Sequence, residues 1–366
     1  MQCRARLLAV VAMLALACCY AHGAANMRDG RHRRAGRRLS PPHLHRNQPD
    51  VESGTGPKPP SAPVNTDLED LLRVLTQRQR LNPRPRLLPF IVNPFSPLLL
   101  CDHHYGTEHE PDPDIVINPL DKDITDTIKP CASICVNAKA FETFVTDVLP
   151  RIRTKVILFT SRFHIPQVRR SPLTDAVKAH PAISHWFAQN PVYPGDERYT
   201  AYPYGIRADL LEEYGPTFLA HHTSQQAEVK TKTIEHLPFT MTHPSRKPFL
   251  TDHVRNAPAL KPVQFYERIA QARFLVSPRG DRPDTYRHWE AIGLGTLPIA
   301  NINRTLYGSL FGDDMVYMED ADKIISLLDE HARDMLERQY HVPAAHRLSS
   351  LFWARQVGAA RDACLK

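Results

Sequence analysis

The sequence predicts an α/β protein made of two halves, each built on a parallel sheet. Two observations support this fold class. Short, continuously apolar runs alternate along the chain with longer segments of helical periodicity, and a polar stretch within 206–235 interrupts the alternation. Strands that alternate with helices indicate parallel sheets. We therefore expect two α/β halves that face one another across a cleft.

Each predicted element has a local signature. An amphipathic helix over 66–81 begins at Thr66, because Glu69 completes a capping box with it. Continuous apolar character predicts fully buried strands, and apolar residues three and four apart predict helices. The predicted strands are 87–93, 154–161, 274–278 and 297–302, and the other predicted helices are 138–152, 285–295 and 320–336.

The first 65 residues differ from the rest. Residues 1–25 combine two arginines, an apolar run and small residues, which is the pattern of a signal peptide or a short signal anchor. Residues 26–65 are rich in arginine, proline and serine and predict a disordered stem. We expect a Golgi or endoplasmic reticulum lumenal protein, single-pass type II through this segment, or a secreted one if the leader is cleaved.

The net charge of +7 resides in this N-terminal part. Residues 1–50 hold nine arginines and two aspartates, so the other 316 residues carry equal numbers of acidic and basic groups. A globular part without excess positive charge has no field to attract a polyanion. We therefore expect no nucleic-acid partner.

Four cysteines follow the leader: Cys101, Cys131, Cys135 and Cys364. An even number suits an oxidising lumen and allows three pairings. We expect Cys101 to pair with Cys131 or Cys135, since Cys364 lies at the far end of the chain. Asn303 begins the only N-x-[ST] sequon without a proline, and we expect it to carry a glycan in the lumen.

The stretch RFLVSPRGDRPDTYRHWEAIGLGTLPIA, residues 273–300, is the most crowded in chemistry. It indicates a strand, a polar loop, a helix that Asp284 is expected to cap, and a second strand. Loops at the carboxyl ends of parallel strands are where open α/β sheets bind ligands. A helix N-terminus at that position favours a phosphate group.

Charged residues of this stretch match a nucleotide. Arg279, Arg282 and Arg287 supply forked donors suited to phosphate oxygens. Glu290, one turn further along the helix, is placed to accept hydrogen bonds from two ribose hydroxyls. The alternative is purely structural, with Arg287 and Glu290 as a surface ion pair and Asp284 as a cap only. The GxxxxGK[ST] pattern of ATP-hydrolysing proteins is absent from the sequence.

The segment SPRGDRPDTYRHWEAIGLGTLPI resembles the C-terminal signature of exostosin-like glycosyltransferases, family 47 and its relatives. In that signature a PRG loop is followed by an R..EA helix and a G..P strand. Three upstream blocks are similar to blocks of exostosin-like proteins: HWFAQN (185–190), YPYGI (202–206) and FTMTHPSR (239–246). The resemblance covers roughly 150–320.

The resemblance implies a GT-B fold, in which two Rossmann-like domains face a cleft and the C-terminal one binds the nucleotide-sugar. Arg279 and Arg287 would neutralise the diphosphate and Glu290 would hold the ribose. The implied nucleotide-sugar-binding set is Arg246, Arg279, Gly280, Asp284, Arg287 and Glu290. The sugar, expected from a UDP-sugar, would pass to a glycan or glycoprotein hydroxyl with inversion, without a cofactor or a bound metal.

An inverting transfer also requires a general base near the acceptor. We select His164, which follows an apolar strand, over Asp102, His103 and His104, which follow another apolar run. The DPD at 112–114 resembles a metal-binding motif, but Pro111 before it and Pro113 within it indicate a turn.

The predicted organisation has five parts: a leader (1–25), a stem (26–65), an acceptor-side domain (66–220), a nucleotide-sugar-binding domain (221–345) and a C-terminal tail or helix (346–366). The alternative function is a non-catalytic, secreted carbohydrate-binding protein with a degenerate GT-B fold. A phosphoester hydrolase is disfavoured, because HExxH, GxSxG and CxxxxxR are absent from the sequence.

Overall fold

The computed structural model describes residues 91–94, 96–106, 128–161, 168–207, 230–328, 334 and 336–366. The chain forms two compact units, Met1–Ala62 and Pro63–Lys366, and every described residue belongs to the second. Some predicted features lie outside the described residues and stay predictions: the leader, the stem, the helix over 66–81, the DPD at 112–114 and His164.

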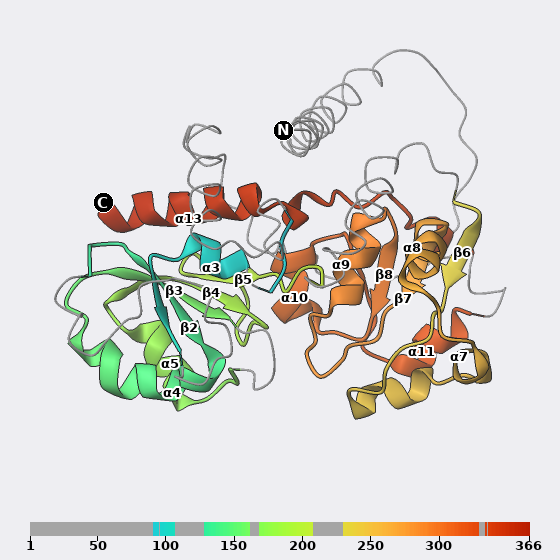
Figure 1. Cartoon of the computed structure of the whole chain (residues 1–366), viewed down its shortest axis with the longest axis horizontal. Coiled ribbons are helices and arrows are strands. Elements are labelled where there is room, and N and C mark those ends of the chain that lie inside the picture. Colours follow the sequence, from blue (N-terminus) through green and yellow to red (C-terminus); the bar gives the residue numbers. More distant parts are fainter. Residues whose placement is uncertain are drawn as a thin grey trace, which may run out of the picture. The chain divides into compact units, whose positions relative to one another are not determined.

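The first described sheet has five strands, all parallel and arranged in sequence order (Figure 1). They are β1 (His103–Tyr105), β2 (Ser133–Asn137), β3 (Val156–Ser161), β4 (Ile183–Gln189) and β5 (Tyr199–Tyr202). Every residue of β2 is buried, as expected for a parallel strand covered on both faces. The strand predicted over 154–161 is β3.

Helices cover both faces of this sheet. The chain is helical from Ala138 to Arg151, where a helix was predicted, but its form changes along η2 (Ala138–Ala140), α4 (Phe141–Thr143), η3 (Phe144–Val148) and η4 (Leu149–Arg151). Helix α5 (Pro172–Ala179) begins with a capping box between Ser171 and Thr174. Helices α3 (Ser96–Leu100) and α13 (Ser350–Leu365) pack on the opposite face from α4 and α5 (Figure 1).

The second described sheet has four parallel strands, again in sequence order: β6 (Lys232–Glu235), β7 (Ala272–Val276), β8 (Leu297–Ala300) and β9 (Val316–Tyr317). The predicted strands over 274–278 and 297–302 correspond to β7 and β8. The helices of this part are η5 (Pro244–Phe249), α7 (Asp252–Asn256), α8 (Pro262–Ala270), α9 (Tyr286–Gly293), α10 (Arg304–Phe311), α11 (Ala321–Ser326) and η6 (His346–Leu348). The predicted α/β class with parallel sheets is confirmed.

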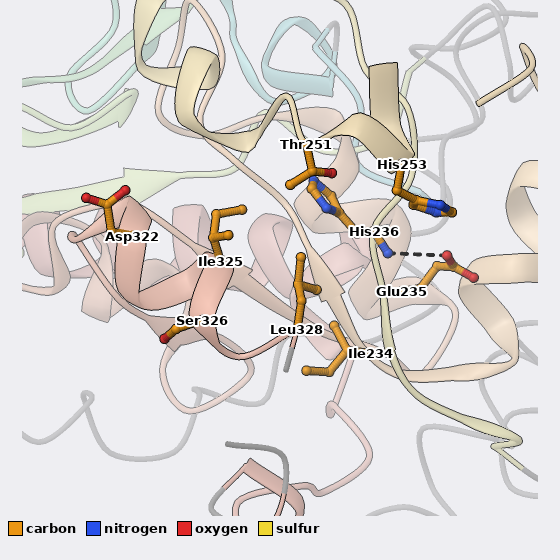
Figure 2. A pocket seen from close by; sticks show the side chains of 9 residues that line it. All are labelled: Ile234, Glu235, His236, Thr251, His253, Asp322, Ile325, Ser326 and Leu328. Carbon is orange, nitrogen blue, oxygen red and sulfur yellow. Dashed lines mark hydrogen bonds between the residues drawn. The ribbon is translucent and has the colours of Figure 1, made fainter. Parts of the chain in front are cut away.

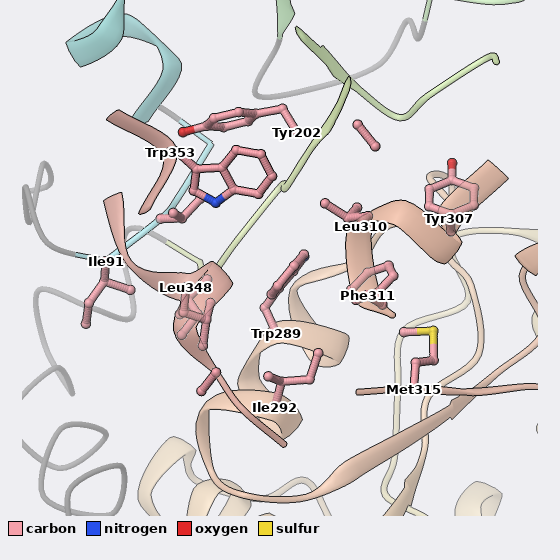
Figure 3. Close-up of a cluster of buried hydrophobic side chains, with 14 of the residues drawn as sticks. Ile91, Tyr202, Trp289, Ile292, Tyr307, Leu310, Phe311, Met315, Leu348 and Trp353 are labelled. Atoms are coloured by element: carbon pink, nitrogen blue, oxygen red, sulfur yellow. The ribbon is translucent and has the colours of Figure 1, made fainter. Parts of the chain in front are cut away.

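One hydrophobic cluster joins the two sheets. Ile157 and Phe159 of β3 belong to it, and so does Leu275 of β7. Leu158, between the first two, belongs to a second cluster on the other face of its sheet, and Phe274 and Val276, on either side of Leu275, belong to a third. Trp289 of α9 and Trp353 of α13 lie in the shared cluster (Figure 3). Both sheets therefore bury one face in the same core, and α13 connects the end of the chain to the first sheet.

The segment predicted as a strand over 87–93 does not join either sheet in its described part. Ile91 makes a single antiparallel bridge with Ser349. The Val92 N–H donates to the Leu348 carbonyl, and the Val92 carbonyl accepts the Ile206 N–H. Gly205 makes this contact possible, because its φ is +76° and a Cβ there would lie 2.1 Å from the Val92 carbonyl oxygen. Ile91 and Val92, described residues of this run, are buried, but they contact two other segments instead of extending a sheet.

Two disulfides involve all four described cysteines. Cys101 is bonded to Cys135, one of the two pairings left open by the sequence, and Cys131 is bonded to Cys364. The second bond fastens the end of α13 to Cys131, two residues before β2. The predicted boundary at 220/221 falls in 208–229, outside the described residues, and stays a prediction. None of the described helices is long and apolar enough to cross a membrane.

We predict that the two disulfides contribute unequally to stability. They join residues 34 and 233 positions apart. In the chain-entropy model, closing such loops is worth about 4 and about 5 kcal/mol, respectively. The pair Cys131→Ser and Cys364→Ser should therefore lower the free energy of unfolding more than Cys101→Ser with Cys135→Ser. Chemical denaturation measures this, and a larger loss in the second double variant would contradict the prediction.

Candidate functional site

The loop that follows β7 lies at the carboxyl end of the second sheet. Its first residue is tied to β8, since the Ser277 N–H donates to the Ile299 carbonyl at 2.9 Å. The Arg279 N–H donates to the Asn301 side chain at 2.8 Å, beyond the end of β8. A tight turn follows, in which the Gly280 N–H donates to the Arg282 carbonyl at 3.0 Å. The loop is thus held by the neighbouring strand end and by its own backbone.

Asp284 connects this loop to the first sheet. Its side chain is fully buried, and its Oδ2 accepts the Tyr204 N–H at 2.6 Å, two residues beyond β5. Its Oδ1 accepts the Trp289 indole N–H at 2.6 Å. The expectation that Asp284 caps the helix is wrong: the N-cap of α9 is Thr285, which makes no side-chain cap bond. The carboxylate instead serves two donors that would otherwise be buried without partners.

Tyr204 makes further contacts with the same loop. The Arg282 guanidinium lies 3.9 Å from the centre of its ring, a cation–π distance. The ring of Tyr286 lies 4.8 Å away, and the Tyr286 hydroxyl donates to the Tyr204 hydroxyl at 3.3 Å. The chain beyond the carboxyl end of β5 therefore meets the chain beyond the carboxyl end of β7. Parallel α/β sheets bind ligands at such ends.

Arg246, predicted to bind the nucleotide-sugar, holds the loop in place. Its guanidinium donates to the carbonyls of Thr240 at 2.6 Å, Arg279 at 3.0 Å and Pro278 at 3.4 Å. Burial lowers the pKa of Arg246, and Asp281 opposes that shift. A Cβ at Gly280 would lie 2.9 Å from the Arg246 Nη2, so glycine at this position allows the guanidinium to approach the loop.

Arg287 holds a second segment. It donates to the carbonyls of Leu237 at 3.3 Å and Pro238 at 2.6 Å, beyond the end of β6, and lies 5.2 Å from the centre of the Phe265 ring. Burial lowers the pKa of Arg287 to about 10, and Glu290 opposes the shift. Glu290 is only 4 % exposed, which rules out a solvent-exposed ion pair on the surface of α9.

Arg279 differs from Arg246 and Arg287. Its backbone is fixed on both sides, but its Nε is buried and has no hydrogen-bond partner among the described residues. The same holds for the hydroxyl of Thr285, six residues along the loop. Buried polar atoms in native proteins are nearly always hydrogen-bonded, so each of these two atoms is a candidate to contact a ligand. Both atoms carry a hydrogen that they can donate to an anion.

His288, to which the sequence analysis assigned no role, is fully buried beneath this loop. Its Nε2 lies 3.0 Å from the Pro283 carbonyl, which can only accept, so Nε2 carries the proton. Its Nδ1 then accepts from the Ser277 hydroxyl at 2.7 Å. Burial lowers the pKa of His288 to about 3, so the ring is neutral and joins the two ends of the loop. No spacing in the sequence signals this contact.

The first sheet contributes a different set of polar groups. Asp102 precedes β1 and therefore lies at the amino end of the sheet, where its carboxylate accepts from Ser133 and Arg361. Asp102, an alternative to His164 as general base, is therefore engaged at the amino end of the sheet. Asn190, which follows β4 at its carboxyl end, has a φ of +54° and a buried Oδ1 without a hydrogen-bond partner among the described residues. Asn190 is the last residue of the HWFAQN segment that resembles exostosin-like proteins, but the sequence analysis assigned it no role.

Asn303, the predicted glycosylation site, is the N-cap of α10. Its Oδ1 accepts the Leu306 N–H at 3.1 Å and its Nδ2 donates to Glu319 at 3.0 Å. The residue is exposed, as a glycosylated asparagine must be, and its glycosylation stays a prediction. No protein-family model matches this chain, and no curated protein matches it significantly.

We predict that Asp284 makes stability depend on pH. Burial raises its pKa from 3.8 to about 7, and the bonds from Tyr204 and Trp289 only partly oppose this shift. A carboxyl group with a higher pKa in the folded state binds more protons there, so its contribution is lost as pH rises through that pKa. The stability of the wild type relative to Asp284→Asn should fall between about pH 4 and about pH 7. Denaturation at several pH values measures this stability difference, and a difference that stays constant over this range would contradict the raised pKa of Asp284.

We also predict that Arg287 stabilises the fold. Arg287→Met keeps an apolar side chain against Phe265 but leaves two carbonyls without their charged donor. The free energy of unfolding should fall by roughly 2 to 3 kcal/mol, the range for hydrogen bonds to charged groups. Arg304→Ala is the matched control, because its guanidinium is 72 % exposed and 3.7 Å from its partner Asp313. Equal free energies of unfolding for Arg287→Met and Arg304→Ala would contradict the prediction.

Proposed function

We propose that this protein is a glycosyltransferase of the exostosin-like, GT-B class that takes a sugar from a nucleotide-sugar. The observation that carries the proposal is the pair of buried donors, Arg279 Nε and Thr285 Oγ, that lack partners among the described residues beside α9. They belong to a loop at the carboxyl end of β7, where parallel sheets bind ligands. The meeting of this loop with Tyr204 supports two Rossmann-like domains whose carboxyl ends face one another.

The diphosphate of the donor is the group that fits these atoms. Phosphate oxygens only accept hydrogen bonds when ionised, and a guanidinium N–H and a hydroxyl both donate. The N-terminus of α9 begins directly after Thr285 and adds a partial positive charge. In this proposal Arg246 and Arg287 act by holding the backbone around the loop, and Arg279 contacts the phosphate. Glu290 stays the predicted ribose ligand.

In the proposed reaction the acceptor hydroxyl attacks the anomeric carbon as the bond from that carbon to the diphosphate oxygen breaks. The nucleoside diphosphate leaves with the bonding electrons, a base takes the hydroxyl proton, and the configuration inverts. Negative charge grows on the diphosphate as the bond breaks, so a cation held beside it lowers the barrier. Arg279 is placed for that role, and His164 stays the predicted base.

The two disulfides support a place in the secretory pathway. Disulfides form and persist in oxidising compartments and are rare in the cytosol. We therefore propose that the enzyme acts in the Golgi or endoplasmic reticulum lumen, or outside the cell, on a glycan or glycoprotein hydroxyl. A UDP-sugar is the donor that we would test first.

The proposal predicts that nucleoside diphosphates bind and that Arg279 is responsible for much of the affinity. UDP or GDP at 100 times its Kd should stabilise the purified protein by about 2.7 kcal/mol. Arg279→Ala should weaken binding by roughly 10- to 100-fold, the equivalent of one or two charge-assisted hydrogen bonds. Arg304→Ala, which removes an exposed arginine, should bind like the wild type.

Thermal shift and calorimetric titration measure the binding, and release of nucleoside diphosphate from UDP- and GDP-sugars measures turnover. If no nucleoside diphosphate binds, or if Arg279→Ala binds normally, the proposed donor site is wrong. Binding without any turnover or transfer would favour the alternative, a carbohydrate-binding protein that retains the fold.

A further inference from the structure

A pocket of 720 Å³ opens at the end of β6, on the side of the second sheet that carries α7 and α11 (Figure 2). Glu235 and His236 line it from the strand end, and Thr251 and His253 from the start of α7. The remaining lining residues come from β6 and from α11 and the residues after it: Ile234, Asp322, Ile325, Ser326 and Leu328. The volume lies within the range of small-molecule sites, about 300 to 1,000 Å³.

His236 is the most unusual group in this pocket. Its side chain is 4 % exposed, and neither ring nitrogen has a hydrogen-bond partner among the described residues. A buried imidazole with two unpartnered nitrogens is costly unless something else satisfies them. Burial lowers the pKa of His236 to about 4, so near pH 7 the ring is neutral, with one nitrogen donating and the other accepting.

The charges around the pocket disfavour an anion as its occupant. No arginine or lysine is among the described residues that line it. The Glu235 carboxylate is already matched by Arg268, at 2.7 Å, and Lys232, at 3.0 Å. Asp322 lies exposed at the rim and adds a negative charge. Within the described chain no group of three or more histidine, cysteine or acidic side chains is arranged to hold a metal ion.

The distribution of polar and apolar groups favours a sugar ring. A pyranose has apolar C–H faces and hydroxyls around its edge that both donate and accept. Ile234, Ile325 and Leu328 offer apolar surface to a face, while Thr251, Ser326, Asp322 and His236 offer polar groups from three different elements to the edge. The Thr251 hydroxyl accepts the Val254 N–H and keeps its own hydrogen for a ligand, and the Ser326 hydroxyl donates to the Lys323 carbonyl and keeps its lone pairs. A nucleobase presents polar atoms along fewer directions and matches these groups less well.

We propose that this pocket is a saccharide-binding subsite in which the neutral His236 ring receives and donates hydrogen bonds to hydroxyls of one uncharged sugar residue. Asp322 accepts a further hydroxyl at the rim. The subsite lies beside β6, apart from the loop after β7, and it does not depend on the proposed transferase activity.

The test uses the whole folded protein and neutral methyl pyranosides as probes: methyl glucoside, galactoside, mannoside, xyloside and N-acetylglucosaminide. The imidazole resonances of His236, assigned by their loss in His236→Phe, are followed by NMR during titration. We expect at least one glycoside to shift them saturably. His180, which does not line the pocket, supplies resonances that should not move.

Two variants then test whether the glycoside binds in this pocket. His236→Phe keeps a ring of similar size but removes both nitrogens, and should weaken glycoside binding about tenfold or more. Asp322→Asn, at an exposed position, should weaken it by roughly 3- to 10-fold. Asp313→Asn is the matched control, because Asp313 is an 89 % exposed carboxylate outside the pocket. If His236→Phe does not fold, saturable glycoside binding by the wild type, measured by calorimetric titration, and its weakening in Asp322→Asn still decide.

Three results would overturn the proposal: no glycoside shifts the His236 resonances, both pocket variants bind as the wild type does, or uridine shifts these resonances where the glycosides do not. The last result would make the pocket a nucleobase site. UDP titrated into Arg279→Ala reports on the proposed donor site separately, so failure of one proposal does not imply failure of the other.

Discussion

The arrangement of the candidate site depends on the buried carboxylate of Asp284. It accepts one hydrogen bond from the backbone beyond β5 and another from the indole of α9, so it fixes where the two sheets meet. Both donors are buried and would lose their partners without it. The cost of burying the carboxylate appears as its raised pKa. The same residue that joins the two sheets therefore makes their junction sensitive to protonation.

The arginines near this junction divide into two kinds. Arg246 and Arg287 donate to backbone carbonyls of segments that lie outside the strands and helices, and they hold those segments where they lie. Arg279 has its backbone fixed by its neighbours and its Nε unpartnered among the described residues. A rigid loop that presents an unpaired donor needs little reorganisation when an anion binds, which is what makes electrostatic stabilisation effective.

The second sheet carries unsatisfied polar groups of two chemical types at neighbouring strand ends. The loop after β7 presents cationic and neutral donors, while the pocket after β6 presents a neutral imidazole among hydroxyls and carboxylates. Arg287 lies between them, because it binds the carbonyls of the residues that follow His236. A change at Arg287 should therefore disturb both places through the backbone of 237–238.

The sequence alone determined the α/β class, the strands β3, β7 and β8, and the polar loop after β7. Continuous apolar runs, and the polar, proline and glycine residues that separate them, are local signals. It also limited the partners of Cys101 to two. Only the tertiary structure decided that Asp284 binds Tyr204 instead of capping α9, that Ile91 bridges Ser349, and that His236 is buried without a partner. These depend on contacts between residues 80 or more positions apart or on the packing around one ring, and local periodicity carries no information about either.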